Sequence, residues 1–204
     1  MAKNMDPIVK RCRVLGISPV VMGYSANSSK AKSTKRNPAG QRRAKKSEYA
    51  LQLNEKQKVK FIYGIMENQM RMYFEKADRS GGVTGEVLLT TIERRLDNVV
   101  FRLGFASTRR SARQMVTHGH YTVNGKRVDI ASYLVKPGDE IAVCDKSRDN
   151  EYFKKLKEED SFVVTPKWLE RDTESLKGKV VAMPERDDID YDVEEHLIVE
   201  LYSK

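Results

Sequence analysis

The sequence predicts an α+β protein in which a discontinuous helical domain carries an inserted small α/β module. Apolar residues recur at three-to-four spacing through residues 47–93, which is the period of an amphipathic helix. Two short amphipathic helices and a hairpin follow from Arg94. The last residues, EEHLIVELYSK, carry an apolar strip too short to be stable alone. We therefore expect this strip to form a helix that docks on the bundle of residues 47–93.

Three parts follow from these patterns. Residues 1–46 form a basic N-terminal extension, with one short helix starting at Asp6-Pro7 and ending at Gly16. Residues 47–93 with 188–204 form the helical domain, as one long helix or two joined near Gly64, then a break at residues 80–82 and a third helix capped by Thr84. Residues 94–187 form the module, with its core at 94–157 and an irregular C-terminal part.

Local signals in the sequence of the module mark where its helices end and where its turns lie. Gly104 ends a helix over residues 96–103, Ser107 or Thr108 caps the next one, and Gly119 ends it. Asn124-Gly125 then predicts a tight hairpin, because both central residues of such a turn need positive φ. A second turn at residues 136–139 precedes a strand at 140–143. Beyond it we expect a helix at 152–159 and strands near Trp168 and at 177–183.

Charge indicates the class of partner. The 204 residues carry a net charge of +9, and 33% of them are charged. Residues 1–46 hold twelve Lys/Arg and one acid, while residues 94–136 hold nine Lys/Arg and two acids, in a chain that is otherwise acidic. A basic tail and a basic module favour binding to nucleic acid over mere solubility.

Several classes are disfavoured. There is no run of about 18 apolar residues, so we expect neither a membrane span nor secretion. Cys12 and Cys144 lie 132 positions apart without a CxxC or Cys/His cluster, which is typical of reduced thiols in a cytoplasmic protein. No P-loop, nucleophile elbow or paired catalytic acid is present. We predict no enzyme, metal, cofactor or small-molecule substrate.

The candidate RNA-binding residues lie in three regions. In the module, Arg109 and Arg113 are four residues apart, which predicts a shared exposed ridge suited to phosphates. The hairpin displays Lys126 and Arg127, and the histidines around Gly119 can hydrogen-bond or stack at the corner before it. The basic extension either orders on RNA or serves as a solvated linker. The full set of candidates is Arg42, Arg43, Lys45, Lys46, Tyr49, Lys56, Lys58, Arg94, Arg109, Arg110, Arg113, His118, His120, Lys126 and Arg127.

These residues also carry a family resemblance. RLDNVVFRLGFASTRRSARQMVTHGHYTVNGKRV resembles the RNA-binding module named after the S-four family of small-subunit ribosomal proteins. LNEKQKVKFIYGIMENQMRMYF, TGEVLLTTIERRLDNVVFR, VNGKRVDIASYLVKPGDEIAV and EEHLIVELYSK are similar to the same bacterial family. The resemblance covers residues 47–204 well and residues 1–46 loosely.

The resemblance implies a structural constituent of the small ribosomal subunit in the cytoplasm. It implies a primary binder of 16S rRNA that nucleates assembly of the subunit body, lies beside neighbouring ribosomal proteins and the channel through which mRNA enters, influences decoding accuracy and can repress its own mRNA. Many relatives carry a four-cysteine zinc knuckle, but this chain keeps only Cys12 there and resembles the zinc-free branch.

Two alternatives are left open. One is an RNA-modifying enzyme or tRNA ligase, because the same module is appended to such enzymes. They need a catalytic domain of about 150–250 residues, and here only about 90 residues precede the module. The other is a protein–protein scaffold that binds through the acidic C-terminal half.

Overall fold

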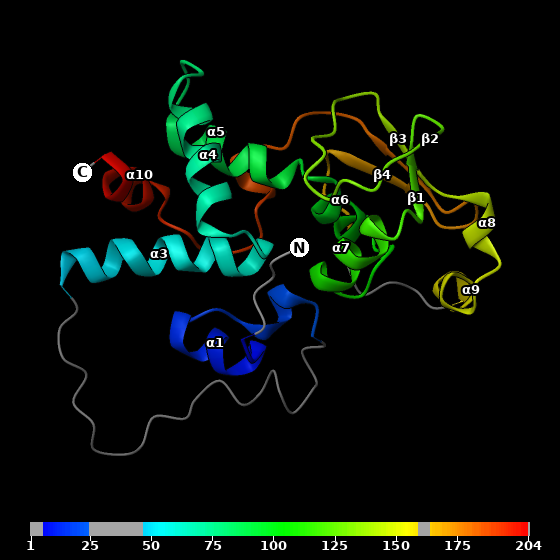
Figure 1. Ribbon diagram of the computed structural model, residues 1–204, viewed down its shortest axis with the longest axis horizontal. Helices are drawn as coiled ribbons and strands as arrows, with labels where there is room; N and C mark the ends of the chain where they lie inside the picture. The colour runs from blue at the N-terminus through cyan, green and yellow to red at the C-terminus, as the bar shows by residue number, and fades with distance from the viewer. Residues whose placement is uncertain (1–5, 25–46, 159–163, 204) are drawn as a thin grey trace. The chain divides into compact units, whose positions relative to one another are not determined.

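The described structure, a computed structural model, covers residues 6–24, 47–158 and 164–203. The chain divides into two compact units (Figure 1). The first unit contains Met1–Leu89 and Ile189–Lys204, and the second contains Thr90–Asp188. Arg42, Arg43, Lys45 and Lys46, four of the predicted RNA contacts, lie outside the described residues.

The first unit is helical. It contains α1 (Ile8–Leu15), the 3₁₀ helix η1 (Pro19–Met22), α3 (Glu48–Tyr63), α4 (Glu67–Asp78), the start of α5 (Thr84–Glu93) and α10 (Glu195–Ser203). Ser47 caps α3, since its hydroxyl accepts the N–H of Ala50 at 3.3 Å. Gly64 ends α3 with φ +63°, a left-handed conformation that terminates helices. The two-helix alternative for residues 47–79 is therefore confirmed.

The C-terminal helix α10 packs on this bundle, as the sequence predicts. Figure 1 shows α10 beside α3. Ile198 of α10 is fully buried, and the ring of Tyr202 stacks on Phe74 of α4 with 4.9 Å between centroids. Gln52 Nε2 of α3 donates to Glu200 Oε2 at 2.9 Å. A helix of nine residues gains its stability here from tertiary packing, because an isolated helix of this length is marginal in water.

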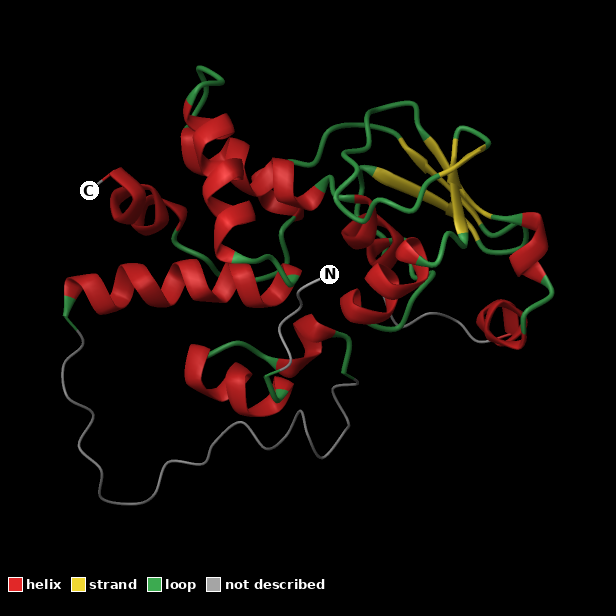
Figure 2. Ribbon diagram, viewed as in Figure 1, coloured by secondary structure: helices red, strands yellow, loops and turns green. Residues whose placement is uncertain are grey.

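The second unit places two helices on an antiparallel sheet (Figure 2). The helices are α6 (Leu96–Arg102) and α7 (Arg109–Thr117). The five strands lie in the order β2-β1-β3-β5-β4, and all their pairings are antiparallel. They are β1 (Tyr121–Val123), β2 (Lys126–Arg127), β3 (Glu140–Val143), β4 (Leu169–Asp172) and β5 (Lys177–Val180). Two short helices, α8 (Asp145–Arg148) and α9 (Glu151–Glu158), follow β3, and the 3₁₀ helix η2 (Arg186–Asp188) follows β5.

The predicted stops and turns of the module are confirmed. Thr108 caps α7 by accepting the N–H of Ser111 at 3.1 Å. Asn124 and Gly125 adopt φ +51° and +76°, which aligns Val123 with Lys126 across the hairpin. The helices and sheet share one core, in which Leu103, Val116 and Ile141 are fully buried.

The C-terminal part of this unit is more regular than the sequence predicts. β5 pairs with β3 in the middle of the sheet, and β4 closes its far edge. Trp168 and Leu176 are buried in the same core as α6 and α7. Residues 164–180 are therefore part of the module's framework.

Candidate nucleic-acid interface

The β1–β2 hairpin presents two cations to solvent. Lys126 and Arg127 are both exposed. The side chain of Lys126 makes no hydrogen bond or ion pair within the described ranges 6–24, 47–158 and 164–203. Arg127 differs, because its Nη2 donates to the carbonyl oxygen of His118 at 3.0 Å. The hairpin thus contributes one loosely held cation and one anchored cation.

Two imidazoles flank the anchored arginine. The rings of His118 and His120 lie 6.1 Å apart at an interplanar angle of 52°. His120 Nδ1 lies 2.9 Å from Ser147 Oγ, and its ring makes an edge contact with Phe153. Burial, followed by the positive charges of His118 and Arg127, lowers the pKa of His120 below its ordinary value. His120 is therefore neutral at pH 7 and is oriented by its partners, while His118 is exposed.

The three arginines of α7 have three different environments. Arg110 is exposed. Arg113 is mostly buried, with 16% of its side chain accessible, and its Nη1 lies 3.8 Å from Asp97 Oδ2. Arg109 is only 6% exposed, its Nε donates to Asn98 Oδ1 at 2.8 Å, and its guanidinium lies 4.4 Å from the centroid of the Phe101 ring. The predicted exposed ridge of Arg109 and Arg113 is therefore wrong, because Arg109 points into the core.

Arg109 belongs to a buried polar network that the sequence analysis did not identify. Arg102 Nη2 donates to Glu93 Oε1 at 2.8 Å, and Asn98 Nδ2 donates to the Glu93 carbonyl oxygen at 2.9 Å. Beside it, Arg95 is fully buried and binds Asp97 through two hydrogen bonds of 3.0 and 2.6 Å. Buried charges paired in this way fix a packing arrangement. No local spacing signals this network, because its hydrogen bonds join Glu93, at the end of α5, to Asn98 and Arg102 of α6.

Arg94 is a structural residue in this unit. Its Nε donates to the Val135 carbonyl oxygen at 2.9 Å, which ties the start of α6 to the segment before β3. Burial lowers the pKa of Arg94, and the charge of Asp139 partly opposes that effect. The guanidinium is half-buried, so it adds less to the exposed basic surface than the sequence predicts.

The three candidates of the first unit also differ from one another. Tyr49 is 60% exposed near the start of α3. Lys56 is 12% exposed, and its Nζ donates to Glu67 Oε1 at 2.9 Å. Lys58 is 18% exposed, and its Nζ lies 2.6 Å from Glu55 Oε1. Both lysines are therefore held by carboxylates of their own unit, which leaves Tyr49 as the accessible member.

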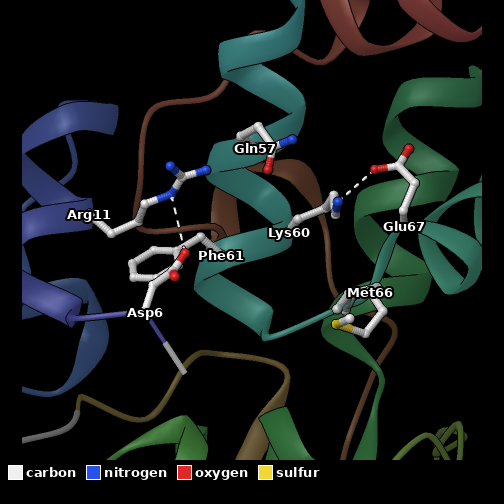
Figure 3. A pocket seen from close by; sticks show the side chains of 8 residues that line it. Asp6, Arg11, Gln57, Lys60, Phe61, Met66 and Glu67 are labelled. Atoms are coloured by element: carbon white, nitrogen blue, oxygen red, sulfur yellow. Dashed lines mark hydrogen bonds and ion pairs between the residues drawn. The ribbon is translucent and has the colours of Figure 1, made fainter. Parts of the chain in front are cut away.

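A shallow pocket of about 250 Å³ also lies in the first unit (Figure 3). Arg11 of α1 faces it together with Gln57, Lys60 and Phe61 of α3. Its charges are balanced, because Arg11 Nε lies 4.0 Å from the carboxylate of Asp6 and Lys60 Nζ lies 2.5 Å from that of Glu67. It has no excess positive charge with which to hold an anion.

Metal-binding clusters and membrane-spanning helices are both absent from residues 6–24, 47–158 and 164–203. No group of three or more His, Cys, Asp or Glu residues there is placed to hold a metal ion. No helix in that part of the chain is long and apolar enough to cross a membrane.

Two exposed cations of the β1–β2 hairpin thus lie with two imidazoles near the corner where α7 ends. We call this set the basic corner: His118, His120, Lys126 and Arg127. Arg110 adds an exposed cation on α7. Oriented imidazole and guanidinium groups on a small rigid module suit phosphates and stacked bases of RNA.

Comparison with known proteins agrees with this chemistry. Residues 94–141 match the S4 domain, and residues 3–93 match the ribosomal protein S4/S9 N-terminal domain. The small ribosomal subunit protein uS4 of Natranaerobius thermophilus is 52% identical over the full length of both chains. The uS4 proteins of Caldicellulosiruptor saccharolyticus and Fusobacterium nucleatum are 51% and 50% identical, again over the whole of each chain. The chain belongs to the small ribosomal subunit protein uS4 family.

Proposed function

We propose that this chain is a structural, non-enzymatic constituent of the small ribosomal subunit that binds 16S rRNA, and hence resides with ribosomes in the cytoplasm. The observation that carries the proposal is the basic corner on an S4 domain, within a chain similar over its full length to uS4 proteins. That full-length similarity, to proteins named as ribosomal, favours this function over an enzyme carrying the same module.

Recognition depends mainly on RNA shape and backbone. Lys126 and Arg127 contact phosphates from the hairpin, and Arg110 adds a contact from α7. The imidazole of His118 stacks on or hydrogen-bonds to an unpaired nucleotide. Because folded RNA hides most base edges, contacts of this kind position the protein without reading much sequence. Neutralising phosphates releases counterions, so affinity should fall steeply with salt.

Finer roles follow from the family resemblance and are proposed on that basis. The chain nucleates assembly of the subunit body and contacts neighbouring ribosomal proteins. It lies along the path by which mRNA enters and influences decoding accuracy, and it represses its own mRNA in some cells. Residues 1–46, 47–93 with 188–204, and 94–187 act as three functional parts, of which the first supplies basic residues to RNA.

Co-sedimentation tests the proposal. The full chain should travel with small subunits through a sucrose gradient, remain bound in moderate salt and be released by ribonuclease. Migration with free protein at the top of the gradient would contradict the assignment. Retention on subunit proteins after complete ribonuclease digestion would point to the scaffold alternative.

We also propose that the chain contains no structural metal. Cys12, the one cysteine of the N-terminal segment, is fully buried, and burial raises the pKa of its thiol, which disfavours the thiolate that zinc requires. Elemental analysis of the purified chain should find zinc far below one equivalent. One equivalent that survives dialysis would contradict this.

A further inference from the structure

We infer that Gly119 is a positioning residue for RNA binding. The space left by its missing side chain seats the guanidinium of Arg127 and presents it as a pre-organised fork for an RNA phosphodiester. This inference rests on the proposed function, because it assigns a geometry and a ligand group to part of the basic corner. Gly119 carries no charge, so a search for basic residues alone would not assign it to this RNA-binding surface.

The close approach of Arg127 to Gly119 is the first observation. A Cβ placed on Gly119 would lie 2.6 Å from Cζ of Arg127 and closer still to Nε and Nη2. Contacts this short do not occur, so any other residue at position 119 must displace the guanidinium. The guanidinium therefore occupies the volume that a side chain would fill, directly over the α7–β1 corner.

The hydrogen bond to His118 is the second observation. Arg127 Nη2 donates to the His118 carbonyl oxygen at 3.0 Å, and this is the guanidinium's one hydrogen bond to the described part of the chain. A guanidinium has five N–H donors in a rigid fork, so four remain. An exposed arginine is normally ordered only when it binds. Here the backbone of Gly119 and the His118 carbonyl order it beforehand.

The fixed position also explains why these groups suit a phosphate. Arg127 lies at the end of β2, where its side chain is exposed, and its free N–H groups can meet two oxygens of one phosphodiester. Lys126, one residue earlier, has no anchor of this kind among the described residues and acts as a mobile point charge. In this pair, Arg127 recognises the geometry of a phosphate, whereas Lys126 contributes its positive charge alone.

The test compares Gly119→Ala with Gly138→Ala in the full chain. Both glycines have positive φ, +73° and +91°, and both lie in the second unit. A Cβ at Gly138 meets nothing within 4 Å, so Gly138→Ala carries the backbone strain without displacing a side chain. Thermal unfolding of both variants shows whether the strain is equal. Affinity is measured for an in vitro transcript of 16S rRNA at several salt concentrations.

We expect Gly119→Ala and Arg127→Ala each to weaken binding roughly tenfold, the loss of one charge-assisted contact. Arg127→Ala should also lower the salt slope by about one phosphate contact, whereas Gly119→Ala keeps the charge and should leave the slope near that of the parent. The double variant should bind no worse than Arg127→Ala, and Gly138→Ala should bind like the parent. Parental affinity of Gly119→Ala, or losses that add fully in the double variant, would overturn the inference.

Arg127→Lys keeps the test decisive if Gly119→Ala does not fold. Lysine retains the charge but cannot present a fork over Gly119, so the salt slope should persist while affinity falls several-fold. Unchanged affinity would overturn the inference. Failure of the parent chain to bind the transcript at all would instead reject the proposed function, which keeps the two claims distinguishable.

Discussion

Three arginines on one nine-residue helix show how little a charge count says about exposure. Arg109 is buried against Phe101, Arg113 is close to Asp97, and Arg110 faces solvent. Their spacing is compatible with the observed helix, but it does not show which of them are exposed. It does not predict that Asn98, eleven residues earlier, accepts a hydrogen bond from Arg109. That pairing depends on how α6 and α7 pack, which no local pattern encodes.

Arg109→Ala should therefore destabilise the fold. The substitution leaves the amide oxygen of Asn98 without this donor and removes the cation from the face of Phe101, at a cost of about 2–3 kcal/mol. Urea denaturation should show the loss as a lower midpoint. Arg110→Ala, on the exposed side of the same helix, is the matched control and should stay within about 0.5 kcal/mol of the parent. Equal effects of the two substitutions would contradict the described environments.

Glu67 makes a pH-dependent contribution to the folding stability of the first unit. Partial burial raises its pKa, but hydrogen bonds from Lys60, Lys56 and Tyr202 outweigh burial and lower it to about 2 from 4.5. Because the folded pKa lies below the unfolded one, the stabilisation is complete above pH 4.5 and is lost as pH falls towards 2.

Glu67→Gln should thus lower the free energy of unfolding at pH 7, and the difference from the parent should vanish near pH 2. Urea denaturation across this range measures it. Glu75→Gln is the control, since Glu75 is half-exposed on the same helix and faces Arg71 at 3.6 Å. A difference that grew on acidification would contradict the sign of the pKa shift.

At the scale of elements, the sequence predicts helix ends and turns, which depend on local residues, but does not predict how distant strands pair. Gly64, Gly104, Thr108 and Asn124-Gly125 mark ends and turns through their own backbone preferences, and the structure places each as predicted. Strands near Trp168 and at 177–183 were predicted, and β4 and β5 confirm them, but no local signal predicts how these strands pair. Each is four residues long and alternates weakly. β5 pairs with β3 about 37 residues earlier in the chain, and β4 pairs with β5. Non-local pairing of short strands is the part that the sequence did not predict.

The docking of α10 on the helices of the first unit can be tested by mutation. Ile198→Ala removes a fully buried side chain between α10 and the helices it covers, which should cost about 2–4 kcal/mol. The His196→Ala control changes a residue whose side chain is 66% exposed on the same helix. Calorimetry should show a lower unfolding temperature for the first variant alone. No difference between them would mean that α10 is not held by this contact.

For the whole molecule, an uneven distribution of charge leads to the assigned function. Within the net charge of +9, the cations have two different roles. Arg95, Arg102 and Arg109 hold the second unit together, whereas Lys126 and Arg127 are left for a partner. Sequence patterns identify the basic module and its family, but they cannot separate these two groups, since burial depends on the packed fold. The role of Gly119 beneath Arg127 was not predicted for the same reason, because a residue without a side chain matters only through the group that packs over it.

The central claim is that the basic corner binds small-subunit rRNA, and equal charge removals test it most directly. Lys126→Ala with Arg127→Ala removes two cations from the corner. Lys154→Ala with Lys155→Ala removes two exposed cations from α9 of the same unit. Affinity for 16S rRNA, measured from low to high salt, should fall at least tenfold for the first variant, with a salt slope smaller by about two contacts. The second variant should match the parent, and equal losses in both variants would contradict the assignment of the corner.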